Sequence, residues 1–243
     1  MMMKSVGVCV ATYNGACYIS EQLDSIIASI LSAGVKNWHI YLSDDGSTDK
    51  TLKILSSYVS ENISVLNGPG KGPAKNFEFL LSQVNEDCIF LSDQDDIWLE
   101  SRVKTSLNAL SYCDVHVCNA SLVDQNLISL GLNLRDIYKT PKSLIAVLIK
   151  NSFTGACMSM NVSVLKDIDP SPPGVMHDWW IGLNAILCSK KIIFGDEVLL
   201  LYRRHSATVT QPNASLNFTL TALISRLRII RFLFFFFIKT INK

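Results

Sequence analysis

Strand-like and helix-like segments alternate through the first 100 residues, and this alternation constrains the fold more than any other feature of the sequence. Short apolar runs predict four strands, at residues 6–12, 39–43, 63–66 and 88–91. Apolar residues at helical spacing predict three helices between them, at residues 19–31, 50–58 and 74–84. Strands that alternate with helices form a parallel sheet covered by helices, so we expect an α/β fold with a mostly parallel sheet.

The second half is patterned less regularly. Strands are expected at residues 115–119, 153–160, 192–194 and 198–202, and helices at residues 141–150 and 179–188. We expect one domain over residues 1–210, with halves at residues 1–100 and 101–210. A basic, apolar segment at residues 214–243 follows and is predicted to form a C-terminal helix.

The composition is that of a folded protein. Of 243 residues, 49% are hydrophobic and 18% are charged, and the formal net charge is +1. These values exclude intrinsic disorder, collagen and coiled coil. They also exclude a uniformly basic surface, so we expect no nucleic-acid partner.

The number and spacing of the cysteines indicate the redox environment of the protein. Seven cysteines form no CxxC pair, and several lie inside apolar runs, as buried free cysteines do. The N-terminal residues are typical of a first strand rather than a signal peptide. Both observations predict a reducing environment and a cytoplasmic protein.

The charges are unevenly distributed along the chain. Residues 1–197 carry 15 basic and 21 acidic side chains, whereas residues 198–243 carry seven basic and no acidic ones. The unbroken apolar run at residues 232–238 is too short to span a membrane. An interfacial helix on the inner face of an anionic membrane fits this pattern, and packing on the body or on a dimer partner is the alternative.

Polar clusters follow three of the predicted strands, at the edge where parallel α/β sheets bind ligands. They lie at residues 12–14, 44–45 and 93–96. In the last cluster Asp93, Asp95 and Asp96 repel one another unless a cation neutralises them, and Mg²⁺ or Mn²⁺ suits such oxygen ligands. A solvated, helix-capping turn is the alternative for this cluster. The carboxylates of Asp44 and Asp45 suit a nucleotide base or ribose, or else a turn and an N-cap.

The order of these motifs is more specific than any one of them. Three segments in succession carry the pattern: Ala11-Thr12-Tyr13-Asn14-Gly15, Ser43-Asp44-Asp45-Gly46-Ser47-Thr48-Asp49 and Leu91-Ser92-Asp93-Gln94-Asp95-Asp96. Together they resemble the family 2 glycosyltransferases, which have a Rossmann-like fold of GT-A type, over about residues 4–205. Two later segments, His177-Asp178-Trp179-Trp180 and Tyr202-Arg203-Arg204-His205, are most similar to the bacterial rhamnosyltransferase-like subgroup.

The resemblance implies a role for each matching residue on the donor side. Residues Thr12, Tyr13 and Asn14 would line the nucleotide pocket. Asp44 would contact the base with Asp45 beside it, and Lys75 and Asn76 would lie near the nucleotide or sugar. Asp93 would contact the ribose or donor sugar and, with Asp95 and His205, would hold the metal on the diphosphate. His205 could equally be a structural histidine.

On the acceptor side, the resemblance implies that Asp178 is the general base of an inverting transfer. The alternative for Asp178 is an N-cap of the helix that follows it. Gly155, Trp179 and Trp180 would bind the acceptor, although a tight strand position and ordinary core packing also explain them.

The resemblance therefore implies a metal-dependent inverting glycosyltransferase with Mn²⁺ or Mg²⁺ as cofactor. Its donor would be a nucleotide-diphospho-sugar, with dTDP-rhamnose favoured over a UDP-hexose. Its acceptor would be a glycan or a polyprenyl-linked glycan in bacterial surface polysaccharide synthesis. Two other functions stay open: an inactive module that binds sugar nucleotides, and a nucleotidyltransferase. The latter usually has a Gly-rich, basic loop after its first strand, which Thr12-Tyr13-Asn14-Gly15 does not provide.

Overall fold

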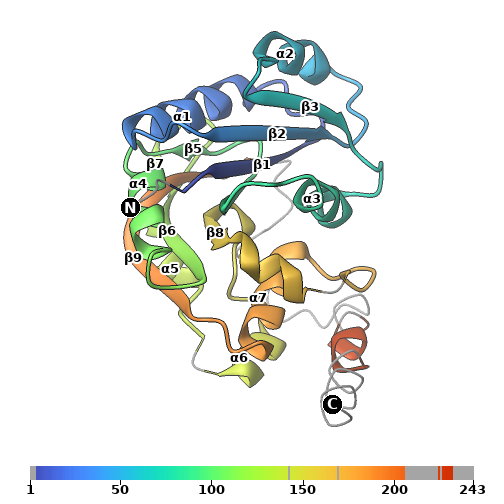
Figure 1. Ribbon diagram of the computed structural model, residues 1–243, viewed down its shortest axis with the longest axis vertical. Coiled ribbons are helices and arrows are strands. Elements are labelled where there is room, and N and C mark those ends of the chain that lie inside the picture. The colour runs from blue at the N-terminus through green and yellow to red at the C-terminus, as the bar shows by residue number, and fades with distance from the viewer. Residues whose placement is uncertain (1–3, 142, 169, 206–223, 225, 232–243) are drawn as a thin grey trace.

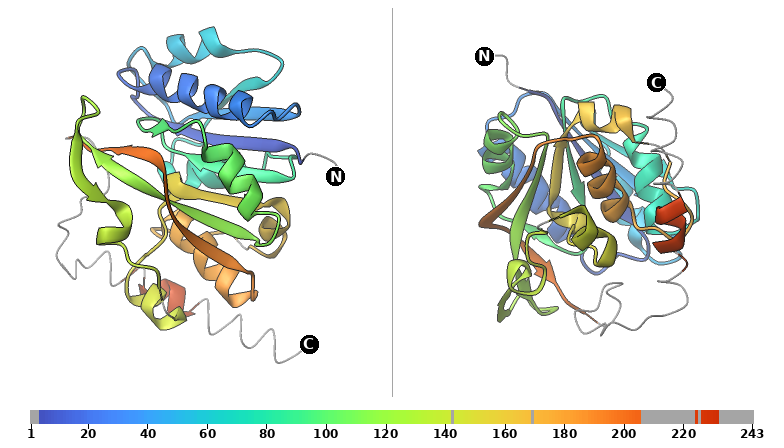
Figure 2. Two further views of the ribbon diagram at one scale, coloured as in Figure 1. Left: turned by 90° about the vertical axis from the view of Figure 1, so that its left-hand side faces the viewer. Right: turned by 90° about the horizontal axis from the view of Figure 1, so that it is seen from below.

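A nine-stranded sheet with helices on both faces makes up the body of the protein (Figures 1 and 2). The structure is a computed structural model, and it describes residues 4–141, 143–168, 170–205, 224 and 226–231. The strands run in the order β3-β2-β1-β4-β8-β6-β9-β5, and β7 pairs with β6 outside this path.

The first half of the chain forms the parallel part of the sheet. Its strands are β1 (Val6–Thr12), β2 (Trp38–Asp44), β3 (Ile63–Asn67) and β4 (Cys88–Ser92), and its helices are α1 (Ile19–Ser32), α2 (Thr51–Tyr58) and α3 (Pro73–Leu81). Right-handed crossovers place α1 and α2 on one face and α3 on the other. The predicted α/β alternation is confirmed, with each element within a few residues of its expected bounds.

Beyond β4 the sheet is mixed, so a mostly parallel sheet describes only the first four strands. Strand β8 (Met158–Asn161) is antiparallel to β4 and to β6 (Val115–Val123), and β9 (Ile192–Arg203) is parallel to β6. The short strand β5 (Ile97–Trp98) pairs with β9, and β7 (Ser129–Asn133) pairs with β6. The two strands expected at residues 192–202 are thus one continuous strand.

The helices of the second half are mostly short. They are α4 (Arg102–Ala109), α5 (Leu134–Ile137), α6 (Leu144–Ile149) and α7 (His177–Leu187), with 3-10 turns at Gly155–Cys157 and Val162–Asp167. The strand expected over residues 153–160 is wrong in its first part, because a 3-10 turn precedes β8 there. Helix α4 and strand β7 were not predicted.

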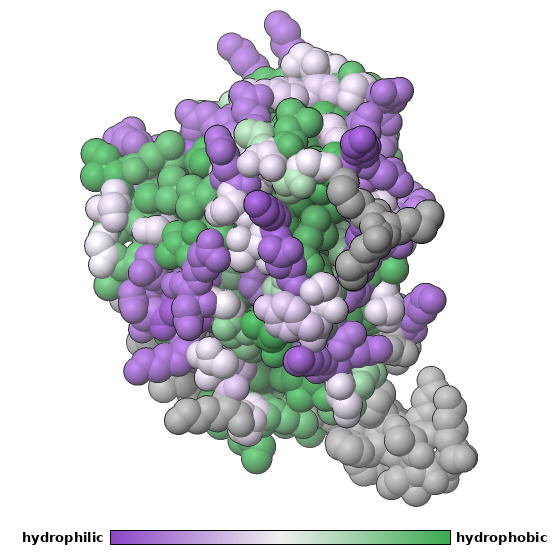
Figure 3. All heavy atoms as spheres, turned by 60° about the vertical axis from the view of Figure 1, so that its left-hand side comes forward, coloured by the Kyte–Doolittle hydropathy of each residue, from purple (hydrophilic) through white to green (hydrophobic). Residues whose placement is uncertain are grey.

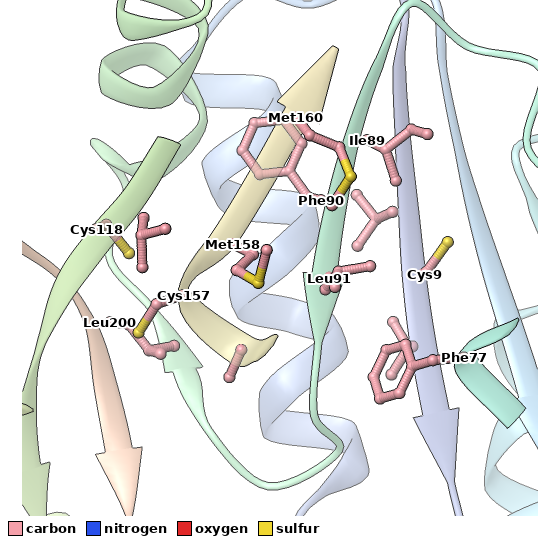
Figure 4. Close-up of a cluster of buried hydrophobic side chains, with 14 of the residues drawn as sticks. Cys9, Phe77, Ile89, Phe90, Leu91, Cys118, Cys157, Met158, Met160 and Leu200 are labelled. Atoms are coloured by element: carbon pink, nitrogen blue, oxygen red, sulfur yellow. The ribbon is translucent and has the colours of Figure 1, made fainter. Parts of the chain in front are cut away.

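The core lies on both sides of β4 and β8. Figure 4 shows Met158 and Met160 of β8 beside Phe90 and Leu91 of β4. All seven cysteines are free, and five of them are buried, as their apolar surroundings predicted.

The described part of the tail packs on the body. Arg226 Nη2 donates to the carbonyl oxygen of Ile149 at 2.8 Å, Arg228 Nη1 donates to that of Pro173, and Ile229 is buried. This agrees with the packing alternative for these residues. The remainder of the predicted helix at residues 214–243, and the domain boundary at residue 210, lie outside the described residues. Within the described ranges, no helix is both long and apolar enough to cross a bilayer.

Candidate active site

The strand order reverses at β1, which lies between β2 and β4, and ligands of open α/β sheets bind beyond the strand ends at such a point. A cavity of about 1440 Å³ opens there. Residues that follow β1, β2 and β4 line one side, and residues from α7, β9 and the loop before β8 line the other. The cavity therefore joins the two halves of the chain.

The loop after β1 is held from two directions. Thr12 Oγ1 donates to Asp44 Oδ2 at 3.0 Å. The Gln94 side chain accepts from the Tyr13 N–H at 2.8 Å and donates to the Tyr13 carbonyl at 3.0 Å. Asn14 adopts a left-handed conformation (φ 49°) and accepts from the Thr48 N–H at 2.9 Å. Thr12, Tyr13 and Asn14 all line the cavity, and the Tyr13 ring is exposed to it.

The two carboxylates at the end of β2, Asp44 and Asp45, are placed differently, and the expected contact of Asp44 with the base stays a prediction. Asp44 is buried, does not line the cavity, and accepts four hydrogen bonds, from Thr12, Gly46 and two groups of Ser47. Asp45 does line the cavity. Its two oxygens accept from the N–H groups of Gly70 and Gly72, each at 2.7 Å. Asp45, rather than Asp44, is the carboxylate that faces the cavity.

Lys75 and Asn76 separate in the same way. Lys75 lies outside the cavity, where its Nζ contacts Glu78 Oε2 at 2.5 Å and Ser171 O at 3.1 Å. Its expected position near the nucleotide or sugar stays a prediction. Asn76 does line the cavity, and its amide bonds to Ser43 tie α3 to β2.

The acidic loop after β4 brings two carboxylates to the cavity. Asp93 and Asp95 line it, and Asp95 Oδ2 lies 2.7 Å from His205 Nε2. Burial, together with the charges of Asp95 and Asp178, raises the pKa of Asp93 to about 7. The His205 ring lies 4.8 Å from that of Tyr18, which fixes its orientation. Two sequence-distant segments thus meet at one polar point.

Asp96 and Arg203 hold the acidic loop in place through hydrogen bonds. Asp96 is almost fully buried and accepts from the Arg203 N–H at 3.0 Å. Burial, together with the neighbouring carboxylates, raises the pKa of Asp96 well above its usual value. The Arg203 guanidinium bonds to the carbonyl oxygens of Asp95 and Gln125 and to Glu21. Both residues are therefore structural supports of Asp95 and His205.

Asp178 lies in the first turn of α7, across the cavity from the acidic loop. One oxygen accepts from Asn151 Nδ2 at 3.2 Å, and the other accepts from the Gly155 N–H at 3.3 Å. Burial raises the pKa of Asp178 to about 6, against the opposing effect of these hydrogen bonds. Met176, not Asp178, is the N-cap residue of the helix. The carboxylate is thus held in place while it faces the cavity.

His177 forms a wall of the cavity rather than a polar contact. Its ring stacks on Phe77 at 3.9 Å between centroids, and within the described residues neither ring nitrogen has a hydrogen-bond partner. Burial lowers the pKa of His177 to about 3, so the ring is neutral. A Cβ atom at Gly155 would lie 2.6 Å from His177 Nε2, which explains why glycine occupies that position.

The two tryptophans of α7 also differ. Trp179 lines the cavity, with its indole N–H donating to the Val147 carbonyl at 2.8 Å. Trp180 is a buried core residue and does not line the cavity, and its expected contact with an acceptor stays a prediction. Adjacent helix positions point about 100° apart, which separates the two rings.

Several residues that line the cavity were missed as site residues by sequence reasoning: Gln94, Tyr138, Asn151 and Tyr202. Gln94 lies inside the acidic motif, so its position was a usable signal. Tyr138 and Asn151 come from an irregular region without a pattern, and only the fold brings them to the cavity.

The donor set at the acidic loop fits a divalent cation. No group of three or more His, Cys, Asp or Glu side chains within the described ranges is arranged to hold a metal by itself. A Mg²⁺ or Mn²⁺ ion that also binds phosphates needs only one or two carboxylates from the protein. Asp93 and Asp95 supply these, and burial together with the charge of Asp95 raises the pKa of Asp93, as expected where a cation is needed. His205 adds a nitrogen donor at the same point.

The fold and site define a GT-A type protein. TarS 1–349 from S. aureus, in complex with UDP-GlcNAc, superposes with a TM-score of 0.66 at 21% identity over 88% of this chain and 61% of that one. The mannosyltransferase PcManGT from Pyrobaculum calidifontis, with GDP-Man and Mn²⁺, superposes with a TM-score of 0.64 at 16% identity over 83% of this chain and 57% of that one.

The chain belongs to glycosyl transferase family 2, whose family model matches residues 7–168. It is 36% identical to the dTDP-rhamnosyl transferase RfbG of Shigella flexneri over 121 residues, which cover 46% of this chain and 40% of that protein. It is 27% identical over 221 residues to an uncharacterized glycosyltransferase of Rickettsia typhi, covering 87% of this chain and 67% of that protein. The chain therefore spans only part of these relatives.

Proposed function

We propose that the protein is an inverting glycosyltransferase that moves a sugar from a nucleotide-diphospho-sugar to an acceptor hydroxyl. One observation carries the proposal: Asp93 and Asp95 enter the cavity from β4, and Asp178 enters it from α7. The charge of Asp178 is close enough to raise the pKa of Asp93. A metal-phosphate site at Asp93 and Asp95 and a base at Asp178 would thus be close enough to act on one bound substrate.

Asp178 would accept the proton of the acceptor hydroxyl as that oxygen attacks the anomeric carbon. The leaving nucleotide diphosphate departs from the opposite face of the sugar, so the anomeric configuration inverts. The raised pKa of about 6 makes Asp178 a stronger base than an exposed aspartate, and it is still ionised at neutral pH. Gly155 and Asn151 hold its two oxygens during this step.

Asp45, Thr12 and Tyr13 would bind the nucleoside, and Asp93 would bind the ribose or donor sugar. Asp93, Asp95 and His205 are the residues that would hold Mn²⁺ or Mg²⁺. The bound cation would neutralise negative charge on the diphosphate leaving group. Arg204, which also lines the cavity, would add a positive charge beside the diphosphate.

The donor we favour is dTDP-rhamnose, supported by the similarity to RfbG. A UDP-hexose with glucosyl or galactosyl transfer is second, because TarS binds UDP-GlcNAc with the same fold. The acceptor would be a glycan or polyprenyl-linked glycan for O-antigen or capsule, reached from the cytoplasmic face of the inner membrane. The acceptor-binding residues would be Gly155 and Trp179, within the half at residues 101–210.

The test is thermal unfolding with Mn²⁺ and with UDP, dTDP or GDP. A nucleotide at 100 times its Kd should stabilise the protein by about 2.7 kcal/mol. Stabilisation by one nucleotide that requires the metal, followed by sugar release from the matching donor, would support the transferase. Stabilisation without any transfer would favour an inactive binding module. No stabilisation by any nucleotide would refute the donor site.

A further inference from the structure

Two stretches of the chain without acidic residues meet at one end of the molecule. Residues 137–166 contain four lysines and no Asp or Glu, and residues 198–243 contain seven basic and no acidic residues. The hydrogen bond from Arg226 to the Ile149 carbonyl joins the two stretches. Figures 1 and 2 show α6 and the described tail helix at the same end, away from α1 and α2. Arg226 of the tail therefore lies beside Ile149 and Lys150 at the end of α6.

Apolar side chains are exposed at this same end. On α6, Ile145 is 68% and Ile149 is 56% exposed, and on the tail helix Leu227 and Ile230 are more than half exposed. Apolar side chains reach the surface at the lower end of Figure 3, the end at which α6 lies in Figure 1. We call these four residues, together with Lys150 and Arg226, the α6–tail face.

The α6–tail face borders the mouth of the cavity. Both Lys150 and Arg226 line the cavity, and Lys150 directly follows α6. Trp179, on the acceptor side, bonds to the Val147 carbonyl within α6. A molecule that rests on this face therefore lies next to the acceptor side of the site.

We propose that the α6–tail face docks the protein on an anionic lipid bilayer, with the cavity mouth turned to the bilayer surface. Aliphatic side chains among lysine and arginine are the composition that binds the headgroup boundary of such a bilayer. The guanidinium of Arg226 keeps its charge while it donates to a carbonyl. After Arg231 the sequence continues into seven apolar residues, 232–238, which extend the same chemistry.

A second exposed apolar cluster lacks the basic residues of the α6–tail face, so the two surfaces differ in the charge that an anionic bilayer would meet. Ile128, Leu130 and Leu132 lie around the edge strand β7 and are all exposed. This cluster is flanked in sequence by Asp124 and Asp136 and contains no basic residue over residues 124–134. An anionic surface would be repelled there. The β7 cluster thus supplies a control of equal hydrophobicity and opposite charge.

Docking would deliver a lipid-linked acceptor to Asp178, and in this respect the inference rests on the proposed transferase function. Docking itself is tested without activity, by flotation of the full chain with vesicles of phosphatidylethanolamine and phosphatidylglycerol. We expect the wild-type protein to float with these vesicles, to float much less with phosphatidylcholine alone, and to be released by salt. The variant Ile145→Glu/Ile149→Glu should lose about tenfold or more in partition, whereas Leu130→Glu/Leu132→Glu should lose none.

Nucleotide-dependent thermal stabilisation of each variant shows that it is folded and separates the two proposals. Stabilisation by a nucleotide in a wild-type protein that does not float overturns docking and leaves the transferase intact. Flotation without stabilisation by any nucleotide supports docking and overturns the transferase proposal. Equal loss of flotation in the α6 and β7 variants also overturns the proposal. A wild-type dimer that Ile145→Glu/Ile149→Glu converts to monomer, without flotation, would identify a second copy as the occupant.

Discussion

Asn151 Nδ2 donates to Asp178 Oδ1 at 3.2 Å, so a loop residue 27 positions earlier in the chain holds one oxygen of the proposed base. This bond favours the ionised carboxylate and lowers the pKa of Asp178, while burial raises it to about 6. The rate of transfer should therefore fall as the pH drops through about 6, because the base becomes protonated.

Replacing Asn151 tests this relationship. The change Asn151→Ala removes a donor to the ionised form, so the pKa of Asp178 rises and the acidic limb of the kcat/KM profile moves to higher pH. The change Asn126→Ala, in the turn before β7, is the control and should leave the profile in place. A limb that stays unmoved in Asn151→Ala would show that another group controls it.

Replacing the base itself should separate chemistry from binding. The change Asp178→Asn keeps the size of the side chain but cannot accept the proton, so we expect transfer to slow by about 10²–10⁴-fold. Stabilisation by nucleotide and Mn²⁺ should persist, because Asp178 lies on the acceptor side. Assays of sugar transfer and thermal unfolding on the same sample measure both, and full activity in this variant would remove Asp178 from the mechanism.

Asp95 should determine the metal requirement. In Asp95→Ala and in His205→Ala, the increase in Tm with nucleotide should no longer depend on Mn²⁺, because the proposed ligands are gone. The exposed acid Glu61 provides a control, since Glu61→Ala removes the same charge far from the cavity. Retention of the metal effect in both site variants would place the metal elsewhere.

The adjacent carboxylates Asp44 and Asp45 should give opposite phenotypes. Asp44→Asn disturbs the four hydrogen bonds that the buried Asp44 carboxylate accepts and should lower stability by about 1–3 kcal/mol. Asp45→Asn weakens the two hydrogen bonds that the Asp45 carboxylate accepts from the N–H groups of Gly70 and Gly72. Its main effect should be a lower affinity for the nucleotide. Denaturant unfolding and nucleotide titration of both variants measure the difference. If Asp44→Asn were stable but unable to bind nucleotide, the assignment would be reversed.

Gly155 should tolerate no side chain while His177 is present. The added methyl group in Gly155→Ala would lie 2.6 Å from His177 Nε2, and such overpacking costs about 1–3 kcal/mol. The displaced backbone would also weaken the N–H bond to Asp178, so the rate should fall as well. The double change Gly155→Ala/His177→Ala removes the contact and should recover part of the stability. Failure to recover would point to strain at Gly155 itself.

The first half of the fold could be predicted because its signals are local. Strand β1 has the bounds expected from its apolar run, and α1 follows from residues spaced on one helix face. The second half depends on pairings between distant segments, such as β4 with β8, that no local pattern encodes. The edge strand β7, with the residue before it, carries an apolar alternation at Ile128, Leu130 and Leu132 that was a usable strand signal, but these side chains are exposed rather than packed on the core.

The sequence motifs predicted where the site lies, but not which residue of each motif faces the cavity and which is buried. Two adjacent aspartates after β2 look alike in sequence, and only the loop at residues 46–47 shows that Asp44 is buried beneath it. Trp179 and Trp180 are equally aromatic, and the packing of α7 decides which one faces the cavity. Asn151 carries no sequence signal, because its role comes from a contact with Asp178 that the fold creates.

The Gln94 side chain makes two hydrogen bonds to the Tyr13 backbone, and its position limits which residues the chain can carry at position 15. An added Cβ at Gly15 would lie 2.2 Å from Gln94 Oε1, so the glycine and the glutamine occupy one space between them. A side chain at position 15 therefore requires that Gln94 move or be replaced by a smaller residue. In a library of variants selected for activity, positions 15 and 94 should therefore change as a pair.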